Sequence, residues 1–536
     1  MKGKAFLLLV FFTIFTQTYT VPLEKTETGF AKNVIILIPD GMSTDGVTLT
    51  RWVYNDGKPL NMDEIASGLV RTHNSDTIIA DSAPGGTALA TGHKTQDKLI
   101  GVKPKKATLY GSDKNDEKDY YSPVASVLEL AKSMGKSAGI IATSEIMHAT
   151  PADFTAHATH RSNYNDITEQ QVFQNLDVVF GGGEFFLKAE NREDKEDMTA
   201  ALKNNNYKVI KNKKELEQLK TGKVWGLFSS KDIPYDIDRT TEPSLADMTK
   251  KAIELLSKNE NGFFLMVEGS KIDWAAHANS PAGLISEIKS FDDAVGVALN
   301  FAKNNKDTLV IISSDHGNGG ITIGNQDTTG NYPEIPLESF VSTLRKVTST
   351  EEALSKRIAE KPENTADLVQ KYFGFTPSDE EIQNLKSKNK TSDIQKILSE
   401  MLNKRSHIGW TTGGHTGEEV VLYVYADDYK NILGGTVQNS DVARYMAKAM
   451  GGDLDKLSSE LFVPSKDFGS YGITVSNDLS DKNNPKFILE KNNSKYIFFE
   501  NRNYFETNNK KTSFNGVVVY NGEELFIPLN ALELIN

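Results

Sequence analysis

Short, almost wholly apolar runs recur along the chain, and longer amphipathic stretches separate them. The runs are Asn33–Pro39, Thr77–Ala80, Ser137–Ala142, Leu176–Phe180, Phe263–Val267, Thr308–Ser313 and Val420–Tyr425. Such runs are typical of strands that are buried on both faces of a sheet. Helical patterns lie between them, at Pro123–Met134, Leu245–Leu256 and Ala282–Ala302. The alternation predicts an α/β fold in which a doubly wound, mostly parallel sheet is sandwiched by helices.

Two regions interrupt this rhythm. Residues from about 333 to 405 are charged and helix-like, and we interpret them as a helical insertion in a catalytic domain that spans residues 21–451. After Gly452 the chain becomes rich in asparagine turns, which separate short strand-like pieces. Residues 452–536 are therefore predicted to form a small β-rich C-terminal appendix, and no motif indicates its role.

The first residues have the pattern of a targeting sequence. Lys2 and Lys4 precede an apolar run from Ala5 to Phe15, and small residues follow just before Val21. This pattern predicts a cleaved signal peptide over residues 1–20. The alternative is a membrane anchor, but the run is shorter than the roughly 20 residues that a span requires. We expect an exported protein, periplasmic or extracellular, without a membrane span after cleavage.

Composition excludes several kinds of function. The chain has no cysteine, so it forms no disulfide, zinc finger, iron–sulfur cluster or thiol nucleophile. Its 72 acidic and 60 basic residues give a formal net charge of −12. Nucleic acid as a stable partner is not expected, because nucleic-acid binding needs a basic surface.

Polar residues follow several of the apolar runs. In doubly wound sheets, sites form beyond the carboxyl ends of the strands. The residues at these positions are Asp40, Asp81, Ser82, Glu268, Asp315 and His316. Asp273 and His277 have a spacing of four, which places both on one face of a helix, and His415 lies in a glycine-rich loop. Each alone is explained by a helix cap, an ion pair or a loop. Together, acids and imidazoles without thiolates suit zinc and magnesium.

Ser82 opens the segment DSAPGGTALATGHKT, which reads as the start of a helix. Backbone N–H groups at such a position favour an anion. On this segment alone a plain N-cap serine is the better interpretation. A Ser–His–acid hydrolase is also possible, although the chain has no G-x-S-x-G elbow.

Six segments then occur in order: IPDGMS, ADSAPGGTALATGHKT, HATPADFTAHATHR, VEGSKIDWAAHAN, SSDHG and GGHTGEE. In this the chain closely resembles the alkaline phosphatase family, from about Asn33 to about Met450. The resemblance implies a parallel-sheet α/β sandwich that hydrolyses phosphate monoesters through a phosphoserine. It also implies two Zn²⁺ and one Mg²⁺ per chain. The sequence leaves the oligomeric state open, with a homodimer as one candidate assembly.

The resemblance assigns a role to each matching position. Asp40 would bridge one zinc and the magnesium, with Asp315 and His316 completing that zinc. Thr150 and Glu268 would be the other magnesium ligands, and Ser82 and Arg161 would be the nucleophile and the phosphate-binding arginine. The second zinc would be held by Asp273, His277 and His415.

Two positions depart from one well-known bacterial member of the family. His148 stands in place of an Asp near the magnesium, and Trp274 in place of a Lys near the phosphate. A neutral Trp274 would remove a positive charge from the phosphate pocket and weaken the retention of product. His148 could become a direct ligand and favour zinc in the third site, because imidazole suits zinc better than magnesium.

Other functions stay open from sequence. A hydrolase of the same metal architecture could act on phosphodiesters, phosphonates or sulfates. A phosphate-binding protein without turnover would have lost the nucleophile or the ligands, and an adhesion protein would depend on residues 452–536. We expect His157 and His160 to pack locally, and His407 to support the site without binding metal.

Overall fold

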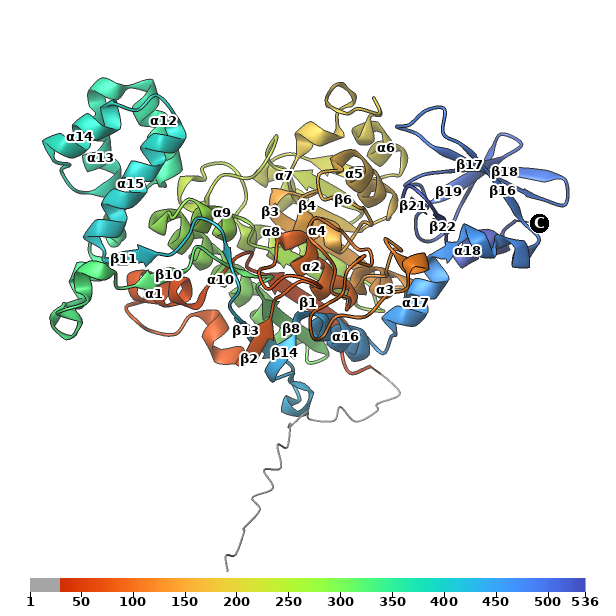
Figure 1. Ribbon diagram of the computed structural model, residues 1–536, viewed down its shortest axis with the longest axis horizontal. Helices are drawn as coiled ribbons and strands as arrows, with labels where there is room; N and C mark the ends of the chain where they lie inside the picture. The colour runs from red at the N-terminus through yellow and green to blue at the C-terminus, as the bar shows by residue number, and fades with distance from the viewer. Residues whose placement is uncertain (1–28, 536) are drawn as a thin grey trace, which may run out of the picture.

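The computed structural model describes residues 29–535, so the predicted signal peptide lies outside the described residues. A ten-stranded sheet forms the centre of the molecule (Figure 1). Across the sheet its strands are β14 (Gly435–Gln438), β2 (Ala66–Arg71), β13 (Val420–Tyr425), β8 (Thr308–Ser313), β1 (Asn33–Ile38), β7 (Phe263–Glu268), β3 (Ser137–Glu145), β4 (Val178–Gly182), β6 (Val224–Leu227) and β5 (Lys208–Ile210). Only β13 runs against its neighbours β8 and β2, which confirms the mostly parallel sheet.

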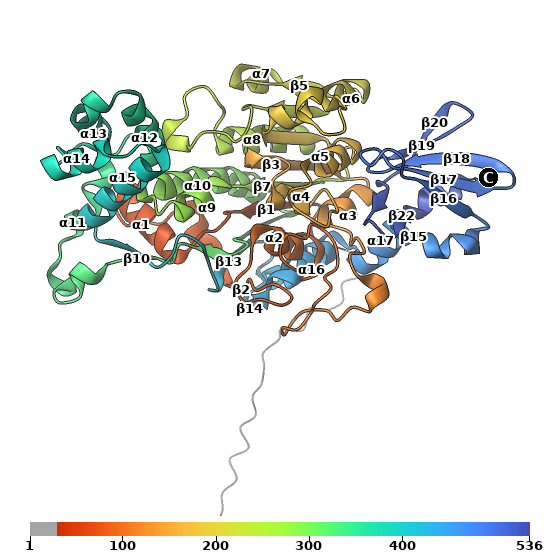
Figure 2. The same cartoon turned by 45° about the horizontal axis from the view of Figure 1, so that its top comes forward.

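Both faces of the sheet are covered by helices. In β1, Val34, Ile36 and Ile38 enter one core, while Ile35 and Leu37 enter the other. The first core is closed by α2 (Ser82–Thr91), α3 (Val127–Ser133), α4 (Ala149–Asp153), α5 (Tyr164–Phe173) and α16 (Asn439–Met450). The opposite face is covered by α1 (Thr44–Asn55), α8 (Leu245–Leu256), α9 (Lys271–His277) and α10 (Pro281–Asn304) (Figure 2). The predicted sandwich is therefore confirmed.

One predicted strand is wrong. The residues of the run Thr77–Ala80 form a loop between β2 and α2. Ile78 and Ile79 are 69% and 52% exposed, so this run lacks the burial on both faces that makes an apolar segment a central strand. Four strands of the sheet were not predicted from sequence. The strands β5, β6 and β14 have only three or four residues, and β2 is mostly exposed or half-buried.

The charged segment after β10 (Ile321–Ile323) forms a separate helical lobe at one end of the molecule (Figure 1). It contains α11 (Leu337–Val341), α12 (Glu351–Glu360), α13 (Thr365–Phe373), α14 (Asp379–Lys386) and α15 (Thr391–Arg405). Leu354, Phe373 and Leu398 lie in a small core of its own. The buried carboxylate of Glu351 accepts hydrogen bonds from the Ser280 hydroxyl and the Ala282 N–H, which ties the lobe to the start of α10.

The C-terminal part lies at the opposite end of the molecule (Figure 1). After α17 (Leu454–Leu461) it forms an antiparallel sheet of β16 (Thr474–Asp478), β17 (Lys486–Lys491), β18 (Ser494–Phe499), β19 (Tyr504–Thr507) and β20 (Lys510–Ser513). A second sheet joins β15 (Val463–Pro464), β22 (Leu525–Ile527) and β21 (Val519–Tyr520). Arg502 anchors this part to the body: it pairs with Glu169 and Glu196, and its guanidinium lies 4.4 Å from the Phe173 ring. Within residues 29–535, no helix has the length and apolar character needed to cross a membrane.

Candidate active site

The candidate site lies at the carboxyl ends of four adjacent strands, β8, β1, β7 and β3. Asp40 follows β1 by two residues, Asp315 follows β8 by two, and Glu268 ends β7. His148 comes three residues after β3, at the start of α4. Because these strands are parallel, their carboxyl ends meet at one edge of the sheet, and residues far apart in sequence converge there.

Asp40, Asp315 and His316 form the first cluster and are fully buried. The His316 Nε2 lies 3.2 Å from Asp315 Oδ2 and 3.5 Å from Asp40 Oδ1. The Gly41 N–H donates to Asp315 Oδ1 over 3.2 Å, which fixes the carboxylate. One atom from each of the three residues lies within 4.8 Å of the others, close enough to share one cation.

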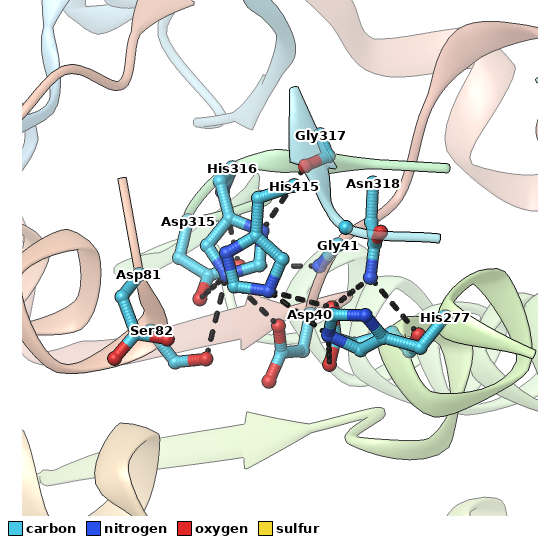
Figure 3. A network of polar contacts seen from close by, with 12 residues as sticks. Asp40, Gly41, Asp81, Ser82, His277, Asp315, His316, Gly317, Asn318 and His415 are labelled. Atoms are coloured by element: carbon cyan, nitrogen blue, oxygen red, sulfur yellow. Dashed lines mark hydrogen bonds and ion pairs between the residues drawn. The ribbon is translucent and has the colours of Figure 1, made fainter. Parts of the chain in front are cut away.

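Asp273, His277 and His415 form the second cluster. As predicted, Asp273 and His277 share one face of helix α9, with Nε2 3.3 Å from Asp273 Oδ2. The short strands β12 (His415–Thr416) and β9 (Gly317–Asn318) pair, and this brings the glycine-rich loop over the site. The His415 Nε2 then lies 3.5 Å from Asp273 Oδ1 and 3.1 Å from the His277 Nε2 (Figure 3).

The imidazoles of His277, His316 and His415 all point the same ring nitrogen toward the backbone. Each has its Nδ1 next to a backbone carbonyl: His277 at 2.8 Å from Gly413, His415 at 2.7 Å from Ala80, and His316 at 3.3 Å from Gly317. Each therefore presents its Nε2 to the carboxylates, as metal-ligating histidines do when a carbonyl holds the other ring nitrogen. The rings of His316 and His415 stack with centroids 3.7 Å apart (Figure 3).

Asp40, Glu268 and His148 form a third cluster, with Thr150 beside them on α4. Asp40 thus belongs to two clusters, as a bridging carboxylate would. Burial, together with the nearby Arg161, lowers the pKa of His148 to about 4, so its imidazole is neutral at neutral pH.

Buried polar atoms without hydrogen-bond partners among the described residues gather at the first and third clusters. They are both carboxylate oxygens of Asp40 and of Glu268, Asp315 Oδ2, Thr150 Oγ1 and His148 Nδ1. Burial and the neighbouring Asp315 raise the pKa of Asp40 well above its usual range, and burial raises that of Glu268 to about 8. Divalent cations would satisfy these atoms and stabilise the charged carboxylates, so the donor set fits zinc and magnesium.

Ser82 and Arg161 lie beside the clusters. Ser82 is the first residue of α2 and Asp81 is its N-cap, which confirms the predicted helix start. The Ser82 Oγ lies 3.4 Å from the His316 Nε2 (Figure 3). The guanidinium of Arg161 donates to Asp81 Oδ2 over 2.5 Å, and its other nitrogen lies 3.1 Å from the His148 Nε2. Trp274 on α9 packs edge-on against the His148 ring, with centroids 5.9 Å apart.

Sequence reasoning missed several supporting residues. The Asn318 amide donates to Asp273 Oδ1 over 2.6 Å, and Glu418 accepts from the Ser43 hydroxyl over 2.6 Å. Asn318 is two residues from His316 and Glu418 three from His415, so closeness to predicted ligands was the available signal. Asp153 is buried on α4 and accepts from the Thr87 hydroxyl of α2 over 2.7 Å.

Three further histidines, His157, His160 and His407, lie outside the three clusters. The His157 ring is held between Glu129 Oε1 at 3.1 Å and the Gly101 carbonyl at 2.9 Å, while the His160 Nδ1 accepts from the nearby Ser162 N–H. His407 packs against Phe340, with ring centroids 5.5 Å apart. None of the three belongs to a metal-competent cluster among the described residues.

The chain is similar to known alkaline phosphatases in both sequence and structure. The family model for alkaline phosphatase matches residues 31–451, so residues 452–536 lie beyond the matched segment. Alkaline phosphatase 4 of Bacillus subtilis is 38% identical over 453 residues, which cover 81% of this chain and 92% of that protein. The cold-active alkaline phosphatase of the psychrophile Shewanella sp. superposes with a TM-score of 0.69 at 27% identity, covering 78% of this chain and 99% of that one.

A second solved structure was determined with a bound metal. It is a variant of the alkaline phosphatase of the Antarctic bacterium TAB5 in which one histidine is replaced by glutamate, with Mg bound in the site named M3. It matches with a TM-score of 0.56 at 27% identity, over 80% of this chain and 99% of that chain. The fold, the convergence of acids and imidazoles on Ser82 and these relatives lead to one conclusion: the chain belongs to the alkaline phosphatase family and is a phosphomonoester hydrolase.

Proposed function

We propose that the chain hydrolyses phosphate monoesters by two successive displacements at phosphorus, with Ser82 as the nucleophile and phosphoserine as the intermediate. One observation carries the proposal. The Ser82 Oγ lies at the N-terminus of a buried helix, 3.4 Å from the His316 Nε2, and the Arg161 guanidinium is tied to the residue directly before it. The Ser82 hydroxyl, the anion-binding N–H groups at the start of α2 and the Arg161 guanidinium would therefore surround one bound phosphate group.

Three cation sites complete the proposal. Asp40, Asp315 and His316 would hold one zinc, and Asp273, His277 and His415 the other. Asp40, Glu268 and Thr150 would form the third site, which the resemblance assigns to magnesium. The partnerless oxygens of Asp40, Glu268 and Asp315 and the common orientation of the three imidazoles support this assignment. When bound, these cations lower the pKa of the serine hydroxyl, neutralise developing negative charge and activate water.

In the first displacement, the Ser82 Oγ gives up its proton and forms a bond to phosphorus, while the bond to the alcohol oxygen breaks and the departing oxygen takes up a proton to leave as the alcohol. Arg161 binds two of the phosphate oxygens through its planar fork, which a lysine could not reproduce. The α2 N–H groups face the growing charge. A cation held by Asp40, Asp315 and His316 would lower the pKa of the Ser82 hydroxyl, so no histidine is needed as its base.

In the second displacement, water attacks the phosphoserine opposite to the Ser82 Oγ. The bond from phosphorus to oxygen of Ser82 breaks, the serine regains a proton, and inorganic phosphate leaves. Two in-line displacements give net retention at phosphorus. Arg161 holds the same oxygens through both steps, so the geometry set by Asp81 serves both.

His148 gives the third site its own character. One of its ring nitrogens lies within 4.8 Å of carboxylate oxygens of Asp40 and Glu268. We propose that it is a ligand that favours zinc over magnesium there. The Mg reported in M3 of the TAB5 variant, in which a histidine has become glutamate, supports the idea that side chains of this type select the metal.

The test uses ³²P-labelled substrate and purified holoenzyme, quenched in acid during turnover. Wild type should carry label on Ser82, and Ser82→Ala should carry none and lose most activity. Ser286→Ala is the matched control, because Ser286 is a buried serine on α10 that bonds only a local carbonyl. Full activity in Ser82→Ala would overturn the mechanism. A methyl diester hydrolysed as well as the aryl monoester would favour a diesterase instead.

Export and assembly belong to the same proposal. A mature N-terminus at Val21, read by protein sequencing of the secreted fraction, would establish cleavage of the predicted signal peptide. We propose a homodimer, which would give twice the chain mass in sedimentation equilibrium. A mature protein that begins at Met1, or a monomer at working concentration, would overturn these two predictions respectively.

A further inference from the structure

Lys271 is the first residue of α9 and is only 2% exposed. Its ammonium forms an ion pair with Asp232 and lies between two aromatic rings, 4.6 Å from the Trp274 centroid and 4.4 Å from the Tyr235 centroid. Burying a lysine is costly unless its charge is compensated, and here one carboxylate and two ring faces do so. This arrangement fixes the positive charge against one face of Trp274.

The contacts continue from Trp274 to the phosphate-binding arginine. The Trp274 ring meets the His148 ring edge-on, at 5.9 Å and an angle of 74°. The His148 Nε2 lies 3.1 Å from a guanidinium nitrogen of Arg161. An unbroken series of contacts therefore joins Lys271, through Trp274 and His148, to Arg161.

We propose that Lys271 is a positioning residue that holds Trp274 in place and supplies positive charge behind its ring, and that it thereby determines how tightly the enzyme retains phosphate. The inference rests on the proposed function, in which Arg161 and Trp274 border the bound phosphate. From sequence, we expected the neutral Trp274 to leave the phosphate pocket without a positive charge at this position. Under the present proposal, Lys271 supplies that charge from behind the ring.

Two physical effects act together. A cation on one face of an indole makes the opposite face and edge less negative, so the ring wall repels a phosphate dianion less. The ring also separates the ammonium from the phosphate pocket. Because the ammonium is buried, fewer water molecules screen its charge than would do so at an open surface. The ion pair with Asp232, which is one-third exposed, keeps the ammonium in register with the ring. Removing the ammonium would release Trp274 and, with it, the His148 ring that packs edge-on against it.

The experiment compares three variants of the full-length, metal-loaded enzyme. Lys271→Met keeps the aliphatic stem and removes the charge. Lys271→Arg keeps the charge and can still stack on both rings. Lys231→Met is the matched control, because it makes the same change in net charge nearby, but its ammonium lies 5.8 Å from the Phe185 ring and not near Trp274.

Three quantities are measured: the inhibition constant of inorganic phosphate, kcat and KM for an aryl phosphate, and tryptophan emission. Lys271→Met should raise the phosphate inhibition constant and KM about 3- to 30-fold, with a smaller change in kcat. Lys271→Arg should stay within about 2-fold of wild type, because the cation remains. Lys231→Met should match wild type. The emission maximum should shift in Lys271→Met only, since a cation beside the indole affects its excited state.

A Trp274→Leu background tests whether Lys271 acts through the ring. In that background, adding Lys271→Met should not change the inhibition constant of phosphate any further. This is the result of a double-mutant cycle in which the two residues are fully coupled. An unchanged phosphate constant in Lys271→Met, or the same loss with and without Trp274, would overturn the inference. If Lys271→Met does not fold, Lys271→Gln takes its place with the same expectations. Absence of labelled phosphoserine in wild type would instead overturn the proposed function, so the two failures are distinguishable.

Discussion

The Arg161 guanidinium lies 2.5 Å from the carboxylate of Asp81, the residue directly before Ser82. Asp81 is the N-cap of α2, so the phosphate-binding arginine is tied to the start of the helix that carries the nucleophile. Burial opposes the charged form of Asp81, but Arg161 outweighs it and lowers the pKa of the carboxyl, so the pair is charged at working pH. The arginine and the serine oxygen are therefore held in one geometry before substrate binds.

Replacing Asp81 should weaken that geometry. Asp81→Asn keeps the shape but removes the charged partner, so the guanidinium loses a fixed orientation and binds phosphate less well. We expect the inhibition constant of phosphate and KM to rise about 3- to 30-fold, the equivalent of one charge-assisted hydrogen bond. Asp113→Asn is the control, since Asp113 pairs with His93 away from the site. Tighter phosphate binding in Asp81→Asn would show that Asp81 only competes for Arg161.

Gly41 is required by the close approach of Asp273. Its φ is +68°, and a Cβ there would stand 2.6 Å from Asp273 Oδ1. Gly41→Ala should therefore push Asp273 out of the second cluster and cost about 100-fold in kcat/KM, as a displacement of about 1 Å can. Steady-state kinetics and metal analysis check this. Gly469→Ala, at an open position where an added Cβ meets nothing within 4 Å, is the control. Retained zinc and activity in Gly41→Ala would contradict the prediction.

The sequence predicted the parts of the site that depend on strand ends. Asp40, Glu268 and Asp315 follow apolar runs that became β1, β7 and β8, because full burial makes such runs unambiguous strands. We predicted that Asp81 and Ser82 follow a strand, but no strand directly precedes them. The residues before them form an exposed loop, and the helix signal at Ser82 gave the correct placement.

The remainder depended on contacts between segments that are distant in sequence. No local pattern indicates that Asn318 meets Asp273, or that Lys271 lies between Tyr235 and Trp274. The loop of His415 reaches the site through the β9–β12 pair, which is two residues long and invisible as periodicity. Resemblance to a family supplied the ligand sets that such distant contacts create.

The buried carboxylate of Asp40, which has no hydrogen-bond partner among the described residues, predicts how stable the metal-free protein is. Asp40 is fully buried among Asp315, Asp273 and Glu268, and without cations their mutual repulsion destabilises the fold. In EDTA, Asp40→Asn should raise the free energy of unfolding by about 1–3 kcal/mol, although it abolishes activity in zinc. Thermal unfolding with and without EDTA measures this. Glu129→Gln, which breaks the buried pair with His157, should destabilise in both conditions. A less stable metal-free Asp40→Asn would show that the carboxylate is already compensated.

His148 should control the metal in the third cluster. A neutral imidazole has one free lone pair, so a cation on His148 competes with the hydrogen bond from Arg161. His148→Asp supplies oxygens for both, and we expect magnesium in place of zinc at the third site, measured by elemental analysis after growth with both metals. His160→Asp is the control, because His160 contacts a local N–H. An unchanged zinc-to-magnesium ratio in His148→Asp would exclude His148 as a ligand.

Glu500 should make the attachment of the C-terminal part sensitive to pH. Burial, with Asp166 and Glu169 of α5 nearby, raises the pKa of Glu500 well above its ordinary value of 4.5. The folded state thus binds this proton more tightly than the unfolded state. Its contribution to stability is full below about pH 4.5 and is lost as the pH rises through the raised pKa. At alkaline pH the ionised carboxylate, close to Asp166 and Glu169, should loosen the contacts of Asn501 and Arg502 with α5.

Hydrogen exchange measures this effect, with rates corrected for the intrinsic dependence on pH. Amides of residues 498–505 should lose protection between pH 6 and pH 9 in wild type, and Glu500→Gln should abolish most of that loss because a neutral amide carries no charge to bury. Glu523→Gln is the control on the same part of the chain, where the side chain is exposed. If Glu500→Gln loses protection with pH as wild type does, then another group, and not Glu500, sets the pH dependence of this contact.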